Sequence, residues 1–280
     1  MYDLAGLEIA LAGSVFAGKL HYSPLTGSTN SDALEAARQG APAWSVYFAD
    51  EQREGRGRAD HQWHSAASDG LYVSVLLRLP IPAVRLPLLP LAVGLAAAEA
   101  VRAASGLTAD LRWPNDLLIS TPRTKTRPWE PRFGARKAGG ILVETKTSGS
   151  EVNFAVVGIG INVHQRSFAP DLATLATSLD LETGARISRQ TLLAALLKSL
   201  EREARALLDS EAAALIPRRA EQASTWMRGR QVEVHGPQAC AGVTTGLDEH
   251  GFLLVRTGDG VVTVQTGGIR DTEMDSGKMD

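Results

Sequence analysis

The alternation of apolar and polar residues predicts strands separated by helices over the first two thirds of the chain. Strands are expected at 20–22, 44–48, 71–77, 111–113 and 117–119. One helix is expected to open at Ser28 and to end at Gly40, because Thr29 and Asp32 have the spacing of a capping box. A mostly buried helix is expected from Leu88 to Ala104. The clearest amphipathic helix spans 187–208, where leucines recur every three or four positions opposite charged residues.

The pattern changes in the second half of the chain. Segments 139–144 and 152–157 predict a hairpin around Ser148-Gly149-Ser150. Residues 121–137 hold three prolines and six basic residues against one acidic residue, which predicts a mobile basic loop rather than a packed element. After residue 230 the period becomes two, with strands expected at 231–234, 242–247, 252–256 and 261–265. These four strands predict a small all-β barrel.

Composition narrows the class of protein. A hydrophobic fraction of 44% and a charged fraction of 21% are those of a globular chain, and a net charge of −2 gives no overall basic field for nucleic acid. Cys240 is the single cysteine, so an internal disulfide is excluded and a reducing compartment is favoured. The longest apolar stretch, 86–98, is too short to span a membrane, and Asp3 and Glu8 argue against a secretory signal. We therefore expect a cytoplasmic protein without a membrane partner.

Two segments combine the groups that bind anions and nucleotides. Residues 52–58 read Gln-Arg-Glu-Gly-Arg-Gly-Arg, where glycines allow close backbone approach and arginines supply forked donors. Residues 112–116 read Arg-Trp-Pro-Asn-Asp and place an amide beside a carboxylate, as needed to bind a ribose or a magnesium ion. Taken separately, a solvated loop and a simple turn explain these segments equally well or better.

Three further segments have equally plain structural explanations when taken alone. Residues 136–144 place Lys137 before a glycine pair and an apolar strand. Residues 157–163 read Val-Gly-Ile-Gly-Ile-Asn-Val, typical of a strand that allows close packing but also of a strand with a bulge. Ser28-Thr29-Asn30 would serve as a helix cap, or would present hydroxyl and amide groups to a small polar ligand.

The order and spacing of all five segments are far more specific than any one of them. From about residue 20 to 268 the sequence resembles the biotin protein ligases. The resemblance implies an α+β fold, with a mixed, largely antiparallel sheet packed against helices and an SH3-like C-terminal barrel. It implies a catalytic domain over 1–228, the barrel over 229–270 and a disordered tail over 271–280. Such enzymes use ATP and magnesium to form biotinyl-5′-AMP and then biotinylate one lysine of a biotin carboxyl carrier protein.

The resemblance also implies roles for residues on the biotin side. Ser28, Thr29 and Asn30 would line the ureido end of biotin, and Gln52 would contact biotin. Arg56, Gly57 and Arg58 would close over biotin and the phosphate of the adenylate, and Gly140 would belong to the biotin site.

On the nucleotide side, Trp63 would stack near the adenine and Asn162 would contact the adenylate. Asn115 and Asp116 would hold the nucleotide, with Asp116 as a magnesium ligand. Lys137 would bridge the biotin carboxylate and the α-phosphate, so that Lys137 and Arg58 are the predicted catalytic cations.

The sequence also departs from the family pattern. Ala59-Asp60-His61 replace further basic residues, and Arg112 stands where lysine is common. Residues 121–135 form an insertion to which the pattern assigns no role. Only 27 residues precede Ser28, too few for the winged helix-turn-helix of repressor-type members, so no DNA partner is expected.

Two other functions stay open at the level of sequence. A lipoate or octanoate ligase or transferase would share the fold, although the Gly-Arg-Gly-Arg loop argues against it. A nucleic-acid-binding module would use the C-terminal strands, but these carry few aromatic residues for stacking. The sequence decides neither the oligomeric state, a homodimer included, nor which carboxylase supplies the carrier, acetyl-CoA carboxylase or a related one.

Overall fold

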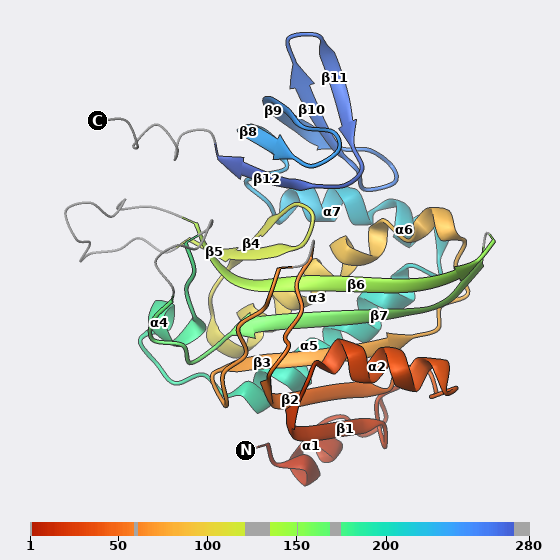
Figure 1. The fold of residues 1–280 in the computed structure, drawn as a ribbon, viewed down its shortest axis with the longest axis vertical. Helices are drawn as coiled ribbons and strands as arrows, with labels where there is room; N and C mark the ends of the chain where they lie inside the picture. Colours follow the sequence, from red (N-terminus) through yellow and green to blue (C-terminus); the bar gives the residue numbers. More distant parts are fainter. Residues whose placement is uncertain (1, 59–60, 121–134, 150, 169–174, 272–280) are drawn as a thin grey trace.

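A seven-stranded sheet forms the centre of the molecule (Figure 1). The computed structural model describes residues 2–58, 61–120, 135–149, 151–168 and 175–271. The strand order is β1-β2-β3-β7-β6-β5-β4, where β1 and β2 pair in parallel and the other neighbours pair antiparallel. The predicted mixed, largely antiparallel sheet is confirmed. Its strands are β1 (Leu20–Thr26), β2 (Val46–Gln52), β3 (Gly70–Leu77), β4 (Ala109–Arg112), β5 (Asp116–Ile119), β6 (Arg136–Ser148) and β7 (Glu151–Asn162).

Helices cover both faces of this sheet. Figure 1 shows α2 on the near side, against β2 and β3, and α3 and α5 on the far side. The predicted helices at 28–40, 88–104 and 187–208 are confirmed, whereas α1, α4, α6 and α7 were not predicted. The helices are α1 (Leu4–Ala10), α2 (Thr29–Arg38), α3 (Leu88–Ser105), α4 (Leu179–Thr183), α5 (Arg189–Ala206), α6 (Ser210–Ala214) and α7 (Ile216–Gln222), with a 3₁₀ turn at Ala83–Arg85.

The alternation along β7 separates the core from the opposite face of the sheet. Val157, Ile159 and Ile161 are buried in the core shared with α3 and α5. Residues 158, 160 and 162 point the other way, since successive strand side chains alternate. Within the described residues, α3 has the length and composition of a membrane span, but more than half of that window is buried, which accounts for its apolar composition.

A second sheet of five antiparallel strands follows at the C-terminus, in the order β11-β10-β9-β8-β12. Four of these strands were predicted, and β12 was not. The sheet meets the first one where Nε1 of Trp113 donates to the carbonyl of Gly251 at 3.1 Å. Its strands are β8 (Arg228–His235), β9 (Cys240–Leu247), β10 (Leu253–Thr257), β11 (Gly260–Val264) and β12 (Gly268–Asp271).

The predicted basic loop, 121–137, extends too far at its C-terminal end. Arg136 and Lys137 are the first residues of β6, where they pair with Ile119 and Leu118 of β5. The sequence missed this because two basic residues at a strand end look like loop residues. The rest of that segment, 121–134, and most of the predicted disordered tail, 272–280, lie outside the described residues.

Candidate active site

Two glycines of β7 allow other parts of the chain to approach the sheet closely. A Cβ atom on Gly158 would lie 2.1 Å from Oδ1 of Asn30, and one on Gly160 would lie 2.6 Å from the indole ring of Trp63. Both distances are shorter than real contacts of a Cβ atom. These positions therefore require glycine. The close approach is made by the protein's own Asn30 and Trp63, whereas the predicted close packing of a ligand stays a prediction.

A polar network surrounds the start of α2. The backbone N–H of Thr29 donates to Oε1 of Gln52 at 2.9 Å, and its hydroxyl lies 2.8 Å from the hydroxyl of Ser74. Ser74 in turn donates to Oδ1 of Asn30 at 2.5 Å. We call Thr29, Asn30, Gln52 and Ser74 the α2 network. Since Thr29, Asn30 and Ser74 are buried, the network presents preorganised hydrogen-bonding groups to a small polar ligand.

The capping box predicted from Thr29 and Asp32 is wrong. Ser28 is the N-cap residue of α2 and makes no side-chain capping bond. Asp32 accepts instead from the hydroxyl of Thr26 at 2.7 Å, and the hydroxyl of Thr29 belongs to the α2 network. The capping spacing was present, but tertiary partners on β1, β2 and β3 compete for the same side chains.

The glycine-rich loop is tied to the α2 network through Glu144. One carboxylate oxygen of Glu144 accepts from Nδ2 of Asn30 at 2.9 Å, and the other accepts from Nη2 of Arg56 at 2.8 Å. Ser74 and Glu144 therefore position Thr29, Asn30 and Arg56, and the sequence did not identify either of these two supporting residues. A signal existed for Ser74, the one polar side chain in the apolar run 71–77.

Lys137 and Arg112 hold the carboxylate of Asp116 between them. Nζ of Lys137 lies 2.6 Å from Oδ1 of Asp116, and Nη2 of Arg112 lies 2.6 Å from Oδ2. Burial raises the pKa of Asp116, but attraction to Lys137 and Arg112 outweighs burial and lowers this pKa below its usual value. The carboxylate is therefore ionised at neutral pH and fixes the position of the Lys137 ammonium group.

Both oxygens of Asp116, the predicted magnesium ligand, accept from cations in this structure. No cluster of three His, Cys, Asp or Glu side chains occurs in the part of the chain that the structure describes. The role of Asp116 as a magnesium ligand stays a prediction.

A shift in strand register brings Lys137 and Gly140 to the same face of β6. The ladder with β5 is irregular between Leu117 and Leu118, which breaks the strict alternation. A Cβ on Gly140 would lie 3.6 Å from Nζ of Lys137 and 3.2 Å from the ring of Trp63. Nζ of Lys137 lies 5.6 Å from the centroid of that ring, within cation–π distance.

Trp63 also carries a donor without a protein acceptor. Its Nε1 is buried and has no hydrogen-bond partner among the described residues. An unpaired buried donor is costly, so this N–H is available to an acceptor on a ligand.

Arg58 connects the glycine-rich loop to the C-terminal sheet. Its Nη1 donates to the carbonyl of Gly267 at 3.0 Å and lies 3.4 Å from Oδ1 of Asn115. Burial lowers the pKa of Arg58, although Asp116 acts in the opposite direction. Nδ2 of Asn115 donates to the carbonyl of Ile141 at 2.8 Å, so this amide also braces β6.

Asn162 is buried, and its amide is used by the protein itself. Nδ2 donates to the carbonyl of Thr177 at 3.0 Å, and Oδ1 accepts from Nε2 of Gln165 at 3.3 Å. The predicted contact of Asn162 with the adenylate stays a prediction.

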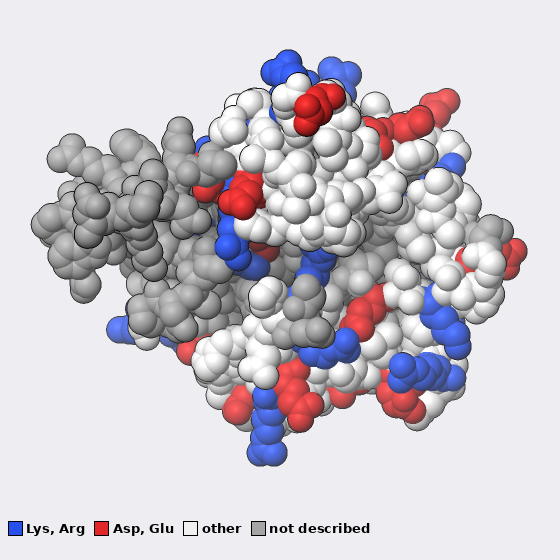
Figure 2. Space-filling model, turned by 45° about the horizontal axis from the view of Figure 1, so that its top comes forward, with Lys and Arg blue, Asp and Glu red and all other residues white. Residues whose placement is uncertain are grey.

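Every residue predicted for the site lines a single cavity of about 1080 Å³. Figure 2 shows the surface hollowed between the two sheets, with basic side chains at the rim of the hollow. Residues 235–237 and 266–270 of the C-terminal sheet line the same cavity, a contribution that the sequence did not reveal. The volume exceeds the usual range for one small ligand and leaves room for two.

The cavity has a polar end at the α2 network, a cationic centre at Lys137 and Arg58, and a wall from the C-terminal sheet. A family model described as the Biotin/lipoate A/B protein ligase family matches residues 22–162. The chain belongs to this family.

Relatives and solved structures agree with that assignment. The chain is 31% identical to the bifunctional ligase/repressor BirA of Bacillus spizizenii, over 94% of this chain and 77% of that protein. It is 32% identical to the biotin–[acetyl-CoA-carboxylase] ligase of Mycobacterium tuberculosis, over 87% of this chain and 85% of that protein. The structure is similar to that of a biotin protein ligase from Aquifex aeolicus in complex with biotin and ATP, with a TM-score of 0.73, 26% identity and coverage of 90% and 98% of the two chains.

Proposed function

We propose that this chain is a biotin protein ligase, which activates biotin with ATP and transfers it to a lysine of a carrier protein. The names of the relatives and the α+β fold support this function. The observation that carries the residue roles is the convergence of Arg58, Lys137 and Asn162, from three distant segments, on one cavity.

In the first step a carboxylate oxygen of biotin attacks the α-phosphorus of ATP, and the bond to the β-phosphate oxygen breaks to release pyrophosphate. No protein nucleophile is needed, so the protein must position two anions and stabilise the added negative charge. Lys137, held by Asp116, and Arg58, held by Gly267, are fixed cations at the centre of the cavity. We assign both to the reacting carboxylate and α-phosphate.

In the second step the amine of the carrier lysine attacks the carbonyl carbon of the mixed anhydride. An amide forms, AMP leaves with the bonding electrons, and the amine loses a proton. The anhydride is labile, so water must be excluded until the carrier docks. The loop carrying Arg56 and Arg58 is tied to Glu144 on one side and to Gly267 on the other, which places it across the cavity.

The α2 network favours biotin over a lipoyl or octanoyl group, the main alternative within this family. A ureido ring offers two N–H donors and a carbonyl that match hydroxyl and amide groups. An aliphatic chain or a dithiolane ring would instead desolvate these polar groups without bonding them, which costs affinity. Calorimetric titration with biotin and with lipoate compares the two, and tighter binding of lipoate would overturn the assignment.

The proposal also covers the carrier protein, the metal ion and the cellular compartment. The carrier is a biotin carboxyl carrier domain of acetyl-CoA carboxylase or a related carboxylase. Magnesium accompanies ATP as a phosphate-bound ion. The single cysteine fits a reducing cytoplasmic compartment.

Mass spectrometry of an apo carrier domain provides the direct test. Incubation with this protein, biotin, ATP and magnesium should add one biotinyl group to one carrier lysine. Lys137→Ala should slow the addition at least tenfold, while Lys146→Ala, an exposed lysine on the same strand, should leave it unchanged. An unmodified carrier, or full activity in Lys137→Ala, would contradict the proposal.

A further inference from the structure

The backbone of Lys137 is held by a segment far along the chain. The N–H of Lys137 donates to the carbonyl of Leu175 at 2.7 Å, and the carbonyl of Lys137 accepts from the N–H of Thr177 at 2.9 Å. These bonds form a parallel bridge between Lys137 of β6 and Ala176, which lies outside the named strands. The position of this residue therefore depends on where residues 175–177 lie.

Residues 175–177 are fixed in turn to the chain that leaves β7. The hydroxyl of Ser178 donates to the carbonyl of Gln165 at 2.7 Å, and the N–H of Asp180 donates to the carbonyl of Val163 at 2.9 Å. Gln165 and Ser178 are buried. The segment that follows β7 and the segment 175–180 are thereby joined next to Lys137.

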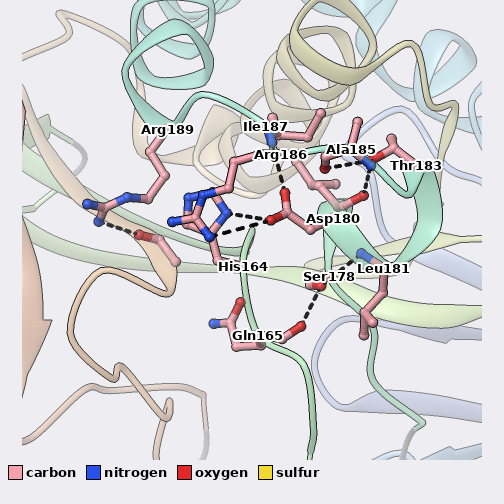
Figure 3. Close-up of polar contacts among 12 residues, drawn as sticks. His164, Gln165, Ser178, Asp180, Leu181, Thr183, Ala185, Arg186, Ile187 and Arg189 are labelled. Carbon is pink, nitrogen blue, oxygen red and sulfur yellow. Dashed lines mark hydrogen bonds and ion pairs between the residues drawn. The ribbon is translucent and has the colours of Figure 1, made fainter.

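A pair of a buried histidine and a partly buried aspartate, His164 and Asp180, forms the side-chain part of this junction (Figure 3). Nδ1 of His164 donates to Oδ2 of Asp180 at 2.8 Å, and Oδ1 of Asp180 accepts from the N–H of Ile187 at 2.9 Å. One carboxylate thus connects the end of β7, the helix α4 and the residues that lead into α5. His164 is 8% exposed, so loss of its partner would leave a buried polar ring without that bond.

Neither His164 nor Asp180 is among the residues that line the cavity. Any effect of the pair on the reaction must therefore pass through the residues that it holds, of which Lys137 is the one in the cationic centre. We propose that His164 and Asp180 are positioning residues for Lys137. The pair keeps residues 175–177 in register with Lys137, so that its ammonium group meets Asp116 and the reacting anions.

This inference depends on the role proposed above for Lys137, and a double-mutant cycle tests the coupling directly. Single-turnover release of pyrophosphate, with enzyme in excess over biotin and with ATP and magnesium present, is compared in wild type, Asp180→Asn, Lys137→Ala and the double variant. Asp180→Asn should slow release about tenfold in the wild-type background and less than twofold in the Lys137→Ala background. Equal losses in both backgrounds, or no loss in either, would overturn the inference.

Two controls separate positioning from general damage to the fold. Arg186 faces the same carboxylate at 4.0 Å, but its side chain is 70% exposed, so Arg186→Ala should leave pyrophosphate release unchanged. His164→Gln replaces the other member of the pair. It should slow pyrophosphate release as Asp180→Asn does, in both the wild-type and the Lys137→Ala backgrounds. Melting temperatures confirm that each variant is folded at the assay temperature. A wild-type protein that released no pyrophosphate would instead contradict the proposed function itself.

Discussion

At the scale of single residues, Gly158 offers a direct test of the close approach of Asn30 to the sheet. Gly158→Ala would place a methyl group 2.1 Å from the buried Oδ1 of Asn30, which is already bonded to Ser74. Overpacking of this kind costs about 1–3 kcal/mol, here at the expense of the α2 network. We expect biotin affinity, measured by calorimetry, to fall at least tenfold.

The matched control for this substitution is Gly258→Ala. Gly258 lies between β10 and β11, with no neighbouring atom within 4 Å of an added Cβ and no positive φ recorded for it. Its replacement should leave biotin affinity within twofold of wild type. An equal loss in both variants would mean that the close approach at Asn30 is not responsible.

A substitution of Asp116 tests whether this carboxylate binds magnesium or holds the neighbouring cations. Asp116→Asn removes the negative charge that holds Lys137 and Arg112, so adenylate formation should fall at least tenfold. Because the structure engages both oxygens of Asp116 with cations, raising the magnesium concentration should not restore the rate. Pyrophosphate release over a range of magnesium concentrations measures this, and recovery at high magnesium would instead support a role as a metal ligand.

At the scale of elements, a partly buried polar cluster joins β1, β2 and α5. Asp50 accepts from the hydroxyl of Tyr22 at 2.6 Å and from Nη2 of Arg189 at 2.8 Å. Burial raises the pKa of Asp50, but the hydrogen bonds and the positive charge of Arg189 outweigh it and lower this pKa. Burial and the bond to Asp50 raise the pKa of Tyr22 to about 12.

The lowered pKa of Asp50 predicts how stability depends on pH. Its contribution is present above the unfolded-state pKa of about 4 and is lost as the pH falls through the lower folded-state pKa. Asp50→Asn should therefore be less stable than wild type at pH 7, and its free energy of unfolding should fall less steeply below about pH 4. Urea denaturation at a series of pH values measures both curves. Asp259→Asn, at an exposed turn, should give a curve parallel to that of wild type, and a parallel curve for Asp50→Asn would contradict the argument.

The elements that the sequence predicted best are those with a strong internal pattern. The leucine period of α5 and the apolar run of β3 were sufficient to place both, because burial of one side is encoded locally. The short helices α1, α4, α6 and α7 were missed, because segments of five to seven residues are too short to show a clear helical period. Arg136 and Lys137 were placed in a loop because the pairing of β6 with β5 is a tertiary event.

The residues of the candidate site also fall into those that the sequence predicted and those that it did not. The motif residues were found because the family pattern fixes their order, and they do line one cavity. Glu144, Ser74 and the wall from the C-terminal sheet were not found, because their contribution depends on which strands become neighbours. The capping interpretation of Thr29 failed for the same reason, since Gln52 and Ser74 compete for its hydroxyl.

At the scale of the whole molecule, the two sheets share one cavity and are joined by specific contacts. Trp113 donates to Gly251, Arg58 donates to Gly267, and the guanidinium groups of Arg112 and Arg230 lie 5.2 Å and 4.4 Å from the Trp226 ring centroid. Arg112 also bonds Asp116 through its Nε and Nη2. A forked guanidinium combines stacking with this pairing, which an ammonium group does not.

These contacts imply that the packing of the C-terminal sheet against the first sheet affects the affinity for ATP more than the affinity for biotin. Trp113→Phe keeps an aromatic side chain but removes the indole N–H, so the carbonyl of Gly251 loses its donor, which costs about 1–3 kcal/mol. Among the described residues, the α2 network makes no hydrogen bond to the C-terminal sheet, whereas Trp113 directly precedes the turn that carries Asn115 and Asp116, the residues expected to hold the nucleotide. We expect ATP affinity to fall several-fold while biotin affinity stays within twofold, as measured by calorimetry with each ligand alone. Phe252→Leu, a change beside Gly251 that removes no hydrogen bond to Trp113, serves as the control, and equal weakening of both ligands in Trp113→Phe would show that the sheets do not divide the cavity in this way.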